Sequence, residues 1–303
     1  MHRKRLPGTR FQILALDVDG TLLDREGTLR PSTAAAVARA AAAGIRPVLC
    51  TGRRYRRARP IAEQLGIDAP IVCNSGAIVK EPDGDRTLWR ADFETPLLAQ
   101  IVALFREGNE PIVSFTDWPP HEPDFLVEHA QVGRTPFDDY VGQNASHSGI
   151  DPGWPERAVS RQAERDQADP WNFPPDGHFH ICAIGSRTEM ETFEEKVLAR
   201  LEGQVRTFVQ KSPRYMGTMC EIIRADASKW TAVLHLAELW GIPAEAIVAV
   251  GDDMNDLPMI LGAGLGVAMG HAPETVRAAA DLVTGDHDND GVAMLVDDVL
   301  LAG

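Results

Sequence analysis

The segment FQILALDVDGTL, residues 11–22, places two carboxylates directly behind an apolar run. Ile13 to Leu16 has the composition of a buried strand, and side chains two residues apart on an extended chain project to one side, so Asp17 and Asp19 can serve one site. Gly20 then permits a sharp bend. Two close carboxylates repel unless a cation or a proton intervenes, which indicates a divalent ion and one carboxyl group that exchanges protons. The competing interpretation is a capped turn, because Asp-Gly pairs are common in turns.

Short apolar runs recur between helical patterns and predict buried parallel strands at 13–16, 47–50, 71–73, 247–250 and 265–269. A first helix is expected over Thr33–Ala43, with Ser32 as its N-cap and Gly44 at its end. A later helix is expected from about Ser228 to Trp240. Strands that alternate with helices predict an α/β fold with a doubly wound parallel sheet, whose ligands gather beyond the carboxyl ends of the strands.

The middle of the chain has a different pattern, and the length of 303 residues suits two domains better than one. It predicts strands at 111–115, 125–128 and 179–184 and helices at 96–107 and 188–201. We interpret residues 82–215 as an inserted α+β cap domain and residues 1–81 and 216–303 as the core. The segments 117–123 and 151–177 are rich in Pro, Trp, Asp and Gly, and we expect long loops there.

The composition narrows the classes of function. With 30 basic and 44 acidic residues the formal net charge is −14, which argues against a general nucleic-acid binder or an anionic-membrane binder. The sequence contains no apolar stretch long enough to span a bilayer and no signal-peptide core, so we infer a cytoplasmic protein. The four cysteines are widely spaced and form no CxxC pair, which favours buried free thiols. No obligate protein partner is inferred.

Three further motifs follow the Asp17/Asp19 pair in the chain. They are Thr51-Gly52-Arg53 after the second strand, Lys229 at the start of a helix, and Gly251-Asp252-Asp253-Met254-Asn255-Asp256 after a late strand. Each alone has an ordinary structural explanation as a turn, an exposed lysine or a helix cap. Together and in this order they resemble the haloacid dehalogenase superfamily, in its Cof-type sugar-phosphatase branch with a C2-type α/β cap. The resemblance runs from Phe11 to about Val296 and includes Asp290-Gly291-Val292-Ala293.

The resemblance implies a covalent mechanism for phosphate-ester hydrolysis. Asp17 would attack phosphorus and become an aspartyl phosphate, and Asp19 would protonate the leaving oxygen and later activate water. Mg²⁺ would be held by the Asp17 side chain, the backbone carbonyl of Asp19 and the Asp252 side chain. Two interpretations of Asp253 stay open: an exposed residue, or a support for the metal shell.

The phosphate group of a small phosphorylated metabolite would meet a second set of residues. Thr51, Gly52 and Arg53 would bind it and Lys229 would offset its charge. The resemblance further implies that Asn255, Asp256 and Asn74 orient these groups, either from behind or on the phosphate side.

The sequence departs from the family pattern at two places. In Asn74-Ser75-Gly76-Ala77 an extra serine is interposed, so either Asn74 or Ser75 fills the family's asparagine position. His271 replaces an asparagine of the family's Gly-Asn-Ala segment, and we interpret it as structural. We expect no second metal site. The arginines at 54, 56, 57 and 59 are interpreted as a solvated helix face rather than as a substrate-steering cluster.

The sequence leaves three functions open. The first is a Mg²⁺-dependent phosphomonoesterase that acts on a small phosphorylated metabolite, in particular a sugar phosphate. The second is a phosphomutase, because an aspartyl phosphate can return its phosphoryl group to a substrate instead of to water. The third is a non-catalytic regulator that binds a phosphorylated metabolite, although a binder does not require a nucleophile and an acid together.

Overall fold

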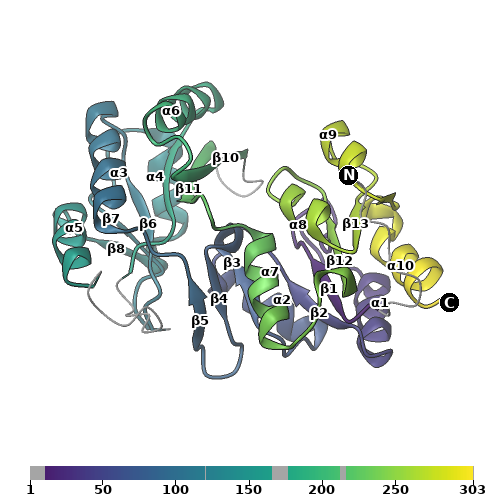
Figure 1. The fold of residues 1–303 in the computed structure, drawn as a ribbon. Helices are drawn as coiled ribbons and strands as arrows, with labels where there is room; N and C mark the ends of the chain where they lie inside the picture. Colours follow the sequence, from purple (N-terminus) through teal and green to yellow (C-terminus); the bar gives the residue numbers. More distant parts are fainter. Residues whose placement is uncertain (1–10, 120, 166–176, 212–215, 303) are drawn as a thin grey trace. The chain divides into compact units, whose positions relative to one another are not determined.

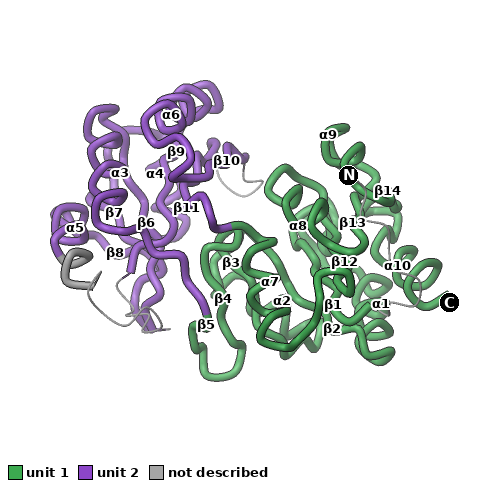
Figure 2. The backbone as a smooth tube through the Cα atoms, viewed as in Figure 1, with its two compact units in different colours: residues 1–88, 228–303 green, residues 89–227 purple. Residues whose placement is uncertain are grey.

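The computed structural model describes residues 11–119, 121–165, 177–211 and 216–302. The chain forms two compact units, one of residues 1–88 and 228–303 and the other of residues 89–227 (Figure 2). Within the described residues, no helix combines the length and the apolar character that crossing a membrane would require.

The first unit is built on a parallel sheet in the order β14-β13-β12-β1-β2. The strands of this sheet are β1 (Ile13–Leu16), β2 (Arg46–Leu49), β12 (Ile247–Gly251), β13 (Leu265–Ala268) and β14 (Leu282–Val283). Every residue of β1 and β12 is buried, as the short apolar runs predict for central parallel strands. The two strands pair in parallel with Leu16 opposite Val250, so the residues that follow them leave the sheet side by side.

Helices cover both faces of this sheet, which confirms the doubly wound prediction (Figure 1). They are α1 (Pro31–Ala42), α2 (Tyr55–Leu65), α7 (Lys229–Leu239), α8 (Leu257–Gly262), α9 (Glu274–Ala279) and α10 (Gly291–Leu295), followed by a π-helical turn (Val296–Leu300). Short 3₁₀ turns lie at Asn74–Gly76, Ala244–Ala246 and His287–Asn289. In Figure 1, α1 and α10 lie on one side of the sheet and α7 and α8 on the other.

The N-cap predicted for the first helix is wrong. Helix α1 begins at Pro31, whose fixed φ suits the first helical position, and its N-cap is Arg30. Ser32 lies inside the first turn, where its hydroxyl donates to Asp290 Oδ1 at 2.5 Å. The serine therefore joins the helix to the turn before α10 instead of capping its own backbone.

The run at Ile71–Cys73 is a strand, β3, but its main partner is antiparallel. It belongs to a small sheet in the order β3-β4-β5 with β4 (Ile78–Lys80) and β5 (Thr87–Arg90). Only a parallel bridge between Cys50 and Val72 joins β3 to the end of β2. That bridge still brings the segment after β3 next to Thr51.

The second unit, residues 89–227, is an α+β domain, as predicted for the middle of the chain. Its sheet runs in the order β10-β11-β9-β6-β7-β8, antiparallel except for the β7–β8 pair. The strands are β6 (Val113–Phe115), β7 (Phe125–Val127), β8 (Ser148–Ile150), β9 (Ile181–Gly185), β10 (Val205–Lys211) and β11 (Thr218–Arg224). The helices are α3 (Thr95–Gly108), α4 (Thr135–Gln143), α5 (Trp154–Arg165) and α6 (Arg187–Arg200), with a 3₁₀ turn at Ala145–His147.

Helix α5 contradicts the loop expected over residues 151–177. Its sequence is highly polar, but Trp154 and Ala158 are buried in the core cluster of this unit and the helix packs on α3. Val159, which is partly buried, packs against the same cluster. These few apolar anchors suffice, because tertiary packing supplies most of the stability of a short helix. Residue 120 of the other expected loop and residues 166–176 lie outside the described residues.

The units divide at residues 88 and 227, whereas the sequence pattern placed the cap at residues 82–215. The second boundary differs because Thr218–Arg224, taken as a return strand of the core, pairs with β9 and β10. All four cysteines are buried free thiols, as expected.

Candidate active site

Asp17 and Asp252 leave the sheet from two neighbouring strands. Asp17 follows β1, its side chain is almost fully buried, and its backbone N–H donates to the carbonyl of Val250 at 3.0 Å. Asp252 follows β12, the strand paired with β1. Parallel pairing therefore brings together two carboxylates that are 235 positions apart in the sequence.

Lys229 lies between the acidic groups. Its Nζ donates to Asp17 Oδ1 and to Asp256 Oδ1, each at 2.6 Å, and to Asn255 Oδ1 at 3.3 Å. The lysine is the first residue of α7, whose N-cap Ser228 forms a reciprocal capping box with Thr231. The cap fixes the start of the helix and so fixes the point from which the lysine extends.

Asp256 holds the loop together. One of its oxygens accepts from Lys229, and the other accepts from the backbone N–H groups of Asp252 at 3.0 Å and Asp253 at 3.1 Å. Gly251 is required beside it, because a Cβ at that position would lie 2.4 Å from the Asp256 Cβ. Both oxygens of Asp256 are thus committed to donors of the protein.

Burial and the charges of neighbouring groups determine the pKa values in this cluster. Burial, reinforced by the charges of Asp256 and Asp252, raises the pKa of Asp17 well above its usual range despite the nearby lysine. Burial also raises the pKa of Asp256, although Lys229 opposes the shift. For Lys229 burial alone would lower the pKa, but the adjacent carboxylates of Asp17 and Asp256 raise it above its ordinary value. The two carboxylates therefore stabilise the charged ammonium form of Lys229.

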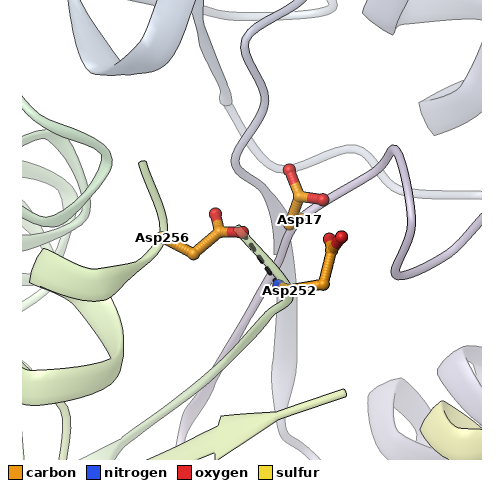
Figure 3. A group of neighbouring side chains, drawn as sticks. All are labelled: Asp17, Asp252 and Asp256. Atoms are coloured by element: carbon orange, nitrogen blue, oxygen red, sulfur yellow. Dashed lines mark hydrogen bonds between the residues drawn. The ribbon is translucent and has the colours of Figure 1, made fainter. Parts of the chain in front are cut away.

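The arrangement suits a divalent cation. Carboxylate oxygens of Asp17, Asp252 and Asp256 lie within 4.8 Å of one another, and Figure 3 shows the three side chains gathered at the ends of their elements. Three carboxylates and one ammonium leave an excess of two negative charges, which one divalent ion would neutralise. Since Asp256 is occupied by donors, Asp17 and Asp252 are the side chains suited to bind the ion.

Asp252 is held in place from two sides. Thr21 Oγ1 donates to its Oδ1 at 3.2 Å. The carboxylate also lies over Gly20, where an added Cβ would come within 2.4 Å of Asp252 Oδ2. The glycine after the first motif therefore does more than bend the chain: it leaves the space that the carboxylate fills.

Asp19 is outside this buried group. Its side chain is 46% exposed and pairs with Arg53, whose Nε and Nη2 lie 2.6 and 2.5 Å from the two carboxylate oxygens. The family resemblance assigned Arg53 to the substrate, and in this structure the guanidinium binds Asp19. The nucleophile candidate and the acid candidate thus have separate cationic partners, Lys229 and Arg53.

The segment after β2 lies against the segment after β3. Thr51 is fully buried and its hydroxyl accepts from the Arg53 N–H at 3.0 Å. A Cβ on Gly52 would lie 3.4 Å from Ser75 Oγ and 3.8 Å from Asn255 Nδ2. Asn74 and Ser75 are both buried and both have positive φ, 50° and 57°. Of these two, Ser75 presents its side chain to Gly52.

Asp253 and His271 lie in the loops that follow β12 and β13. Asp253 is exposed, is not one of the three clustered carboxylates among the described residues, and accepts the Met254 N–H at 2.7 Å. His271, interpreted from the sequence as structural, has its Nε2 3.5 Å from Asp252 Oδ2. Its replacement of the family asparagine was the signal that it faces the site.

Comparison with known proteins identifies related chains. A family model described as haloacid dehalogenase-like hydrolase matches residues 14–296. The pyridoxal phosphate phosphatase YbhA of Escherichia coli (strain K12) is 27% identical, with 94% of this chain and 97% of that protein covered. The 5-amino-6-(5-phospho-D-ribitylamino)uracil phosphatase YwtE of Bacillus subtilis (strain 168) is 26% identical, with 96% and 98% covered.

Among solved structures, a haloalkanoate-superfamily phosphatase of Bacteroides thetaiotaomicron superposes with a TM-score of 0.74 at 23% identity, covering 96% of both chains. At that identity the likeness shows the fold, which is the fold described above. Since the family model spans almost the entire described chain, the protein belongs to the haloacid dehalogenase-like hydrolases and is a phosphatase of that family.

Proposed function

We propose that the protein hydrolyses phosphomonoesters of small metabolites through an aspartyl-phosphate intermediate on Asp17, with Mg²⁺ as its cofactor. The observation that carries the proposal is the contact at 2.6 Å between the buried Asp17 and the ammonium group of Lys229, beside Asp252 at the adjoining strand end. A buried carboxylate with one ammonium partner is a fixed nucleophile, and the ammonium can also attract the negative phosphoryl group.

The chemistry divides into two displacements. In the first, an Asp17 oxygen bonds to phosphorus while the bond to the leaving oxygen breaks, and Asp19 gives that oxygen a proton. In the second, Asp19 takes a proton from water, the water oxygen bonds to phosphorus, and the Asp17 carboxylate and inorganic phosphate are released. Asp19 is suited to this exchange because its side chain is half exposed and lies only two residues from Asp17.

The remaining site residues position these groups. Ser75 Oγ and Asn255 Nδ2 both face Gly52. These side chains, with Thr51 and the backbone at Gly52, would donate to the phosphate oxygens. Asp256 keeps Lys229 and the loop of Asp252 in place. Asp17 and Asp252, with the Asp19 carbonyl, would hold Mg²⁺, which when bound neutralises charge on the transferring phosphoryl group.

The substrate class is a small phosphorylated metabolite, with a sugar phosphate as the first candidate. The relatives named above act on a phosphorylated pyridine and on a phosphoribityl uracil, so a heterocycle with an alkyl phosphate arm is the second candidate. Both are alkyl phosphomonoesters, whose poor leaving groups require the acid assigned to Asp19.

The test is hydrolysis of a panel of sugar phosphates, pyridoxal phosphate and ribityl phosphates in ¹⁸O-labelled water. A phosphatase releases phosphate that contains one labelled oxygen, whereas a phosphomutase produces a phosphorylated isomer without label. Chelation should abolish the release and added Mg²⁺ should restore it. If the protein binds these esters in the presence of Mg²⁺ but releases no phosphate, the alternative of a non-catalytic binding regulator replaces the proposal.

A further inference from the structure

His271 brings an imidazole to a metal site whose other proposed ligands are all oxygen atoms. It lies three residues beyond β13, the strand that pairs with β12, so it leaves the sheet next to Asp252. Its Nε2 is 3.5 Å from Asp252 Oδ2, while Thr21 occupies the other oxygen of the same carboxylate. The imidazole therefore faces the oxygen of Asp252 that Thr21 leaves available.

A second imidazole fixes the orientation of His271. The rings of His271 and His287 are perpendicular, at 83°, with centroids 4.1 Å apart. His287 Nδ1 is 3.1 Å from both ring nitrogens of His271. These contacts restrain the His271 ring beside Asp252.

The turn that carries His287 is itself held in place. Asp286 caps the turn His287–Asn289 by accepting the N–H groups of Asp288 and Asn289 at 2.9 and 2.8 Å. The Asp288 carboxylate accepts from Arg25 Nε at 2.6 Å, in the loop that follows the first motif. The turn that carries His287 is thus held by its own cap, Asp286, and by Arg25 from the N-terminal part of the chain.

We propose that His271, supported by His287, is a metal-selectivity residue: its Nε2 becomes a ligand of a divalent ion bound at Asp252, which favours transition-metal ions over Mg²⁺. This inference rests on the metal site of the proposed function. It adds a nitrogen to that site and creates no second one: among the described residues the one close group of three or more ligands is Asp17, Asp252 and Asp256, and His271 reaches it through Asp252.

Ligand spacing and ligand chemistry support the proposal. Two ligands that each lie about 2.1 Å from one ion are separated by roughly 3.0 to 3.4 Å, and the nitrogen and oxygen here are 3.5 Å apart. Mg²⁺ prefers carboxylate, carbonyl and water oxygens, whereas Co²⁺, Ni²⁺ and Zn²⁺ accept imidazole readily. An asparagine at this position would offer only an amide and would give no such preference.

The experiment measures binding of ions to the metal-free protein without substrate. Calorimetric titration with Co²⁺ and with Mg²⁺ is compared for the wild type, His271→Asn, His271→Gln and Asp252→Ala, with the exposed His121→Asn as a matched control. We expect His271→Asn and His271→Gln to weaken Co²⁺ binding by about tenfold or more and to change Mg²⁺ binding far less. His287→Ala should weaken Co²⁺ binding by a smaller factor, since it removes only the support of the ring.

A spectroscopic measurement tests the ligation directly. Pulsed electron paramagnetic resonance of bound Mn²⁺ should show coupling to a ¹⁴N nucleus in the wild type and in His121→Asn, and should lose it in His271→Asn. Thermal denaturation of each variant verifies that it is folded.

The outcomes separate the two proposals. If Asp252→Ala loses Mg²⁺ and Co²⁺ while His271→Asn binds both as the wild type does, the selectivity role is overturned and the proposed function stands. Loss of both ions in equal measure in a folded His271→Asn variant also overturns it, because it shows a role in holding Asp252 rather than in selecting the ion. If Asp252→Ala binds Mg²⁺ unchanged, the metal site of the proposed function itself is misplaced.

Discussion

Arg53 binds the carboxylate of Asp19 through two parallel contacts, Nε to Oδ2 at 2.6 Å and Nη2 to Oδ1 at 2.5 Å. A planar guanidinium fixes both the position and the rotation of a carboxylate, which a single ammonium group cannot do. Asp19 is therefore aimed by Arg53, while Asp17 is held by Lys229.

The first prediction follows from this two-point contact between Arg53 and Asp19. Arg53→Lys keeps the charge and loses the two-point contact, so Asp19 should deliver its proton less well. We expect kcat on alkyl phosphates to fall by about 10²-fold and kcat on an aryl phosphate with a good leaving group to fall much less. Arg56→Lys in the same cluster is the control. Equal losses on both substrates would assign Arg53 to phosphate binding instead.

The second prediction concerns Asp17. Because burial and neighbouring acids raise its pKa, its ionised form destabilises the metal-free fold at neutral pH. Asp17→Asn should therefore lose turnover by more than about 10⁴-fold while its thermal midpoint without metal stays equal to or above that of the wild type. Asp68→Asn, an exposed aspartate, should change neither quantity. Residual turnover near the wild-type rate would exclude Asp17 as the nucleophile.

The sequence predicts the sheet and the location of the site better than the contacts within it. Apolar runs such as Ile13–Leu16 and Ile247–Gly251 identify strands because burial on both faces leaves little choice of residue type. The order of the strands then brings Asp17 and Asp252 together. Their partners are less predictable, because a contact such as Arg53 with Asp19 depends on rotamers and loop paths that no local pattern encodes.

Two predictions elsewhere in the chain were wrong because contacts between distant residues decide the local structure. Serine is a common N-cap residue, but the helix already begins at Pro31. The Ser32 hydroxyl donates instead to a distant aspartate, Asp290. Helix α5 was not predicted because its sequence is mostly polar and few of its residues pack in the core, namely Trp154, Ala158 and the partly buried Val159. In both cases contacts between residues distant in the sequence override the structure that local propensity predicts.

The third prediction is a pH dependence of stability that arises from His180. This histidine is buried, stacks on Phe115 with centroids 4.6 Å apart, and burial lowers its pKa to about 3. In the unfolded chain a histidine binds a proton below about pH 6.5. Between these values the unfolded state holds the extra proton, so the contribution of His180 to the free energy of unfolding should fall with decreasing pH by up to about 1.4 kcal/mol per pH unit.

The measurement is the free energy of unfolding from urea titrations of the wild type and His180→Phe between pH 6.5 and 5, because the comparison cancels the contributions of other groups such as Asp17 and Asp256. His180→Phe removes one titrating group and should change the slope by the amount expected of His180, whatever its effect on the stability itself. The exposed His121→Phe should retain the wild-type slope. A wild-type slope in His180→Phe would show that another group binds the proton.

The last prediction compares two glycines of the loop after the first motif. Gly20 and Gly27 have similar positive φ values, 83° and 76°, so alanine imposes a similar backbone strain of about 1 kcal/mol at either position. Their surroundings differ: an added Cβ at Gly20 would lie 2.4 Å from Asp252 Oδ2, whereas at Gly27 it meets nothing within 4 Å. Gly27→Ala therefore measures the strain alone, and Gly20→Ala adds displacement of the Asp252 carboxylate. We expect Gly20→Ala to lower the thermal midpoint at least as much as Gly27→Ala does, and a sharply raised Mg²⁺ requirement for phosphate release in Gly20→Ala only. A wild-type Mg²⁺ requirement in Gly20→Ala would mean that the carboxylate over Gly20 does not bind the ion, and an equal increase in Gly27→Ala would assign the effect to the loop backbone rather than to Asp252.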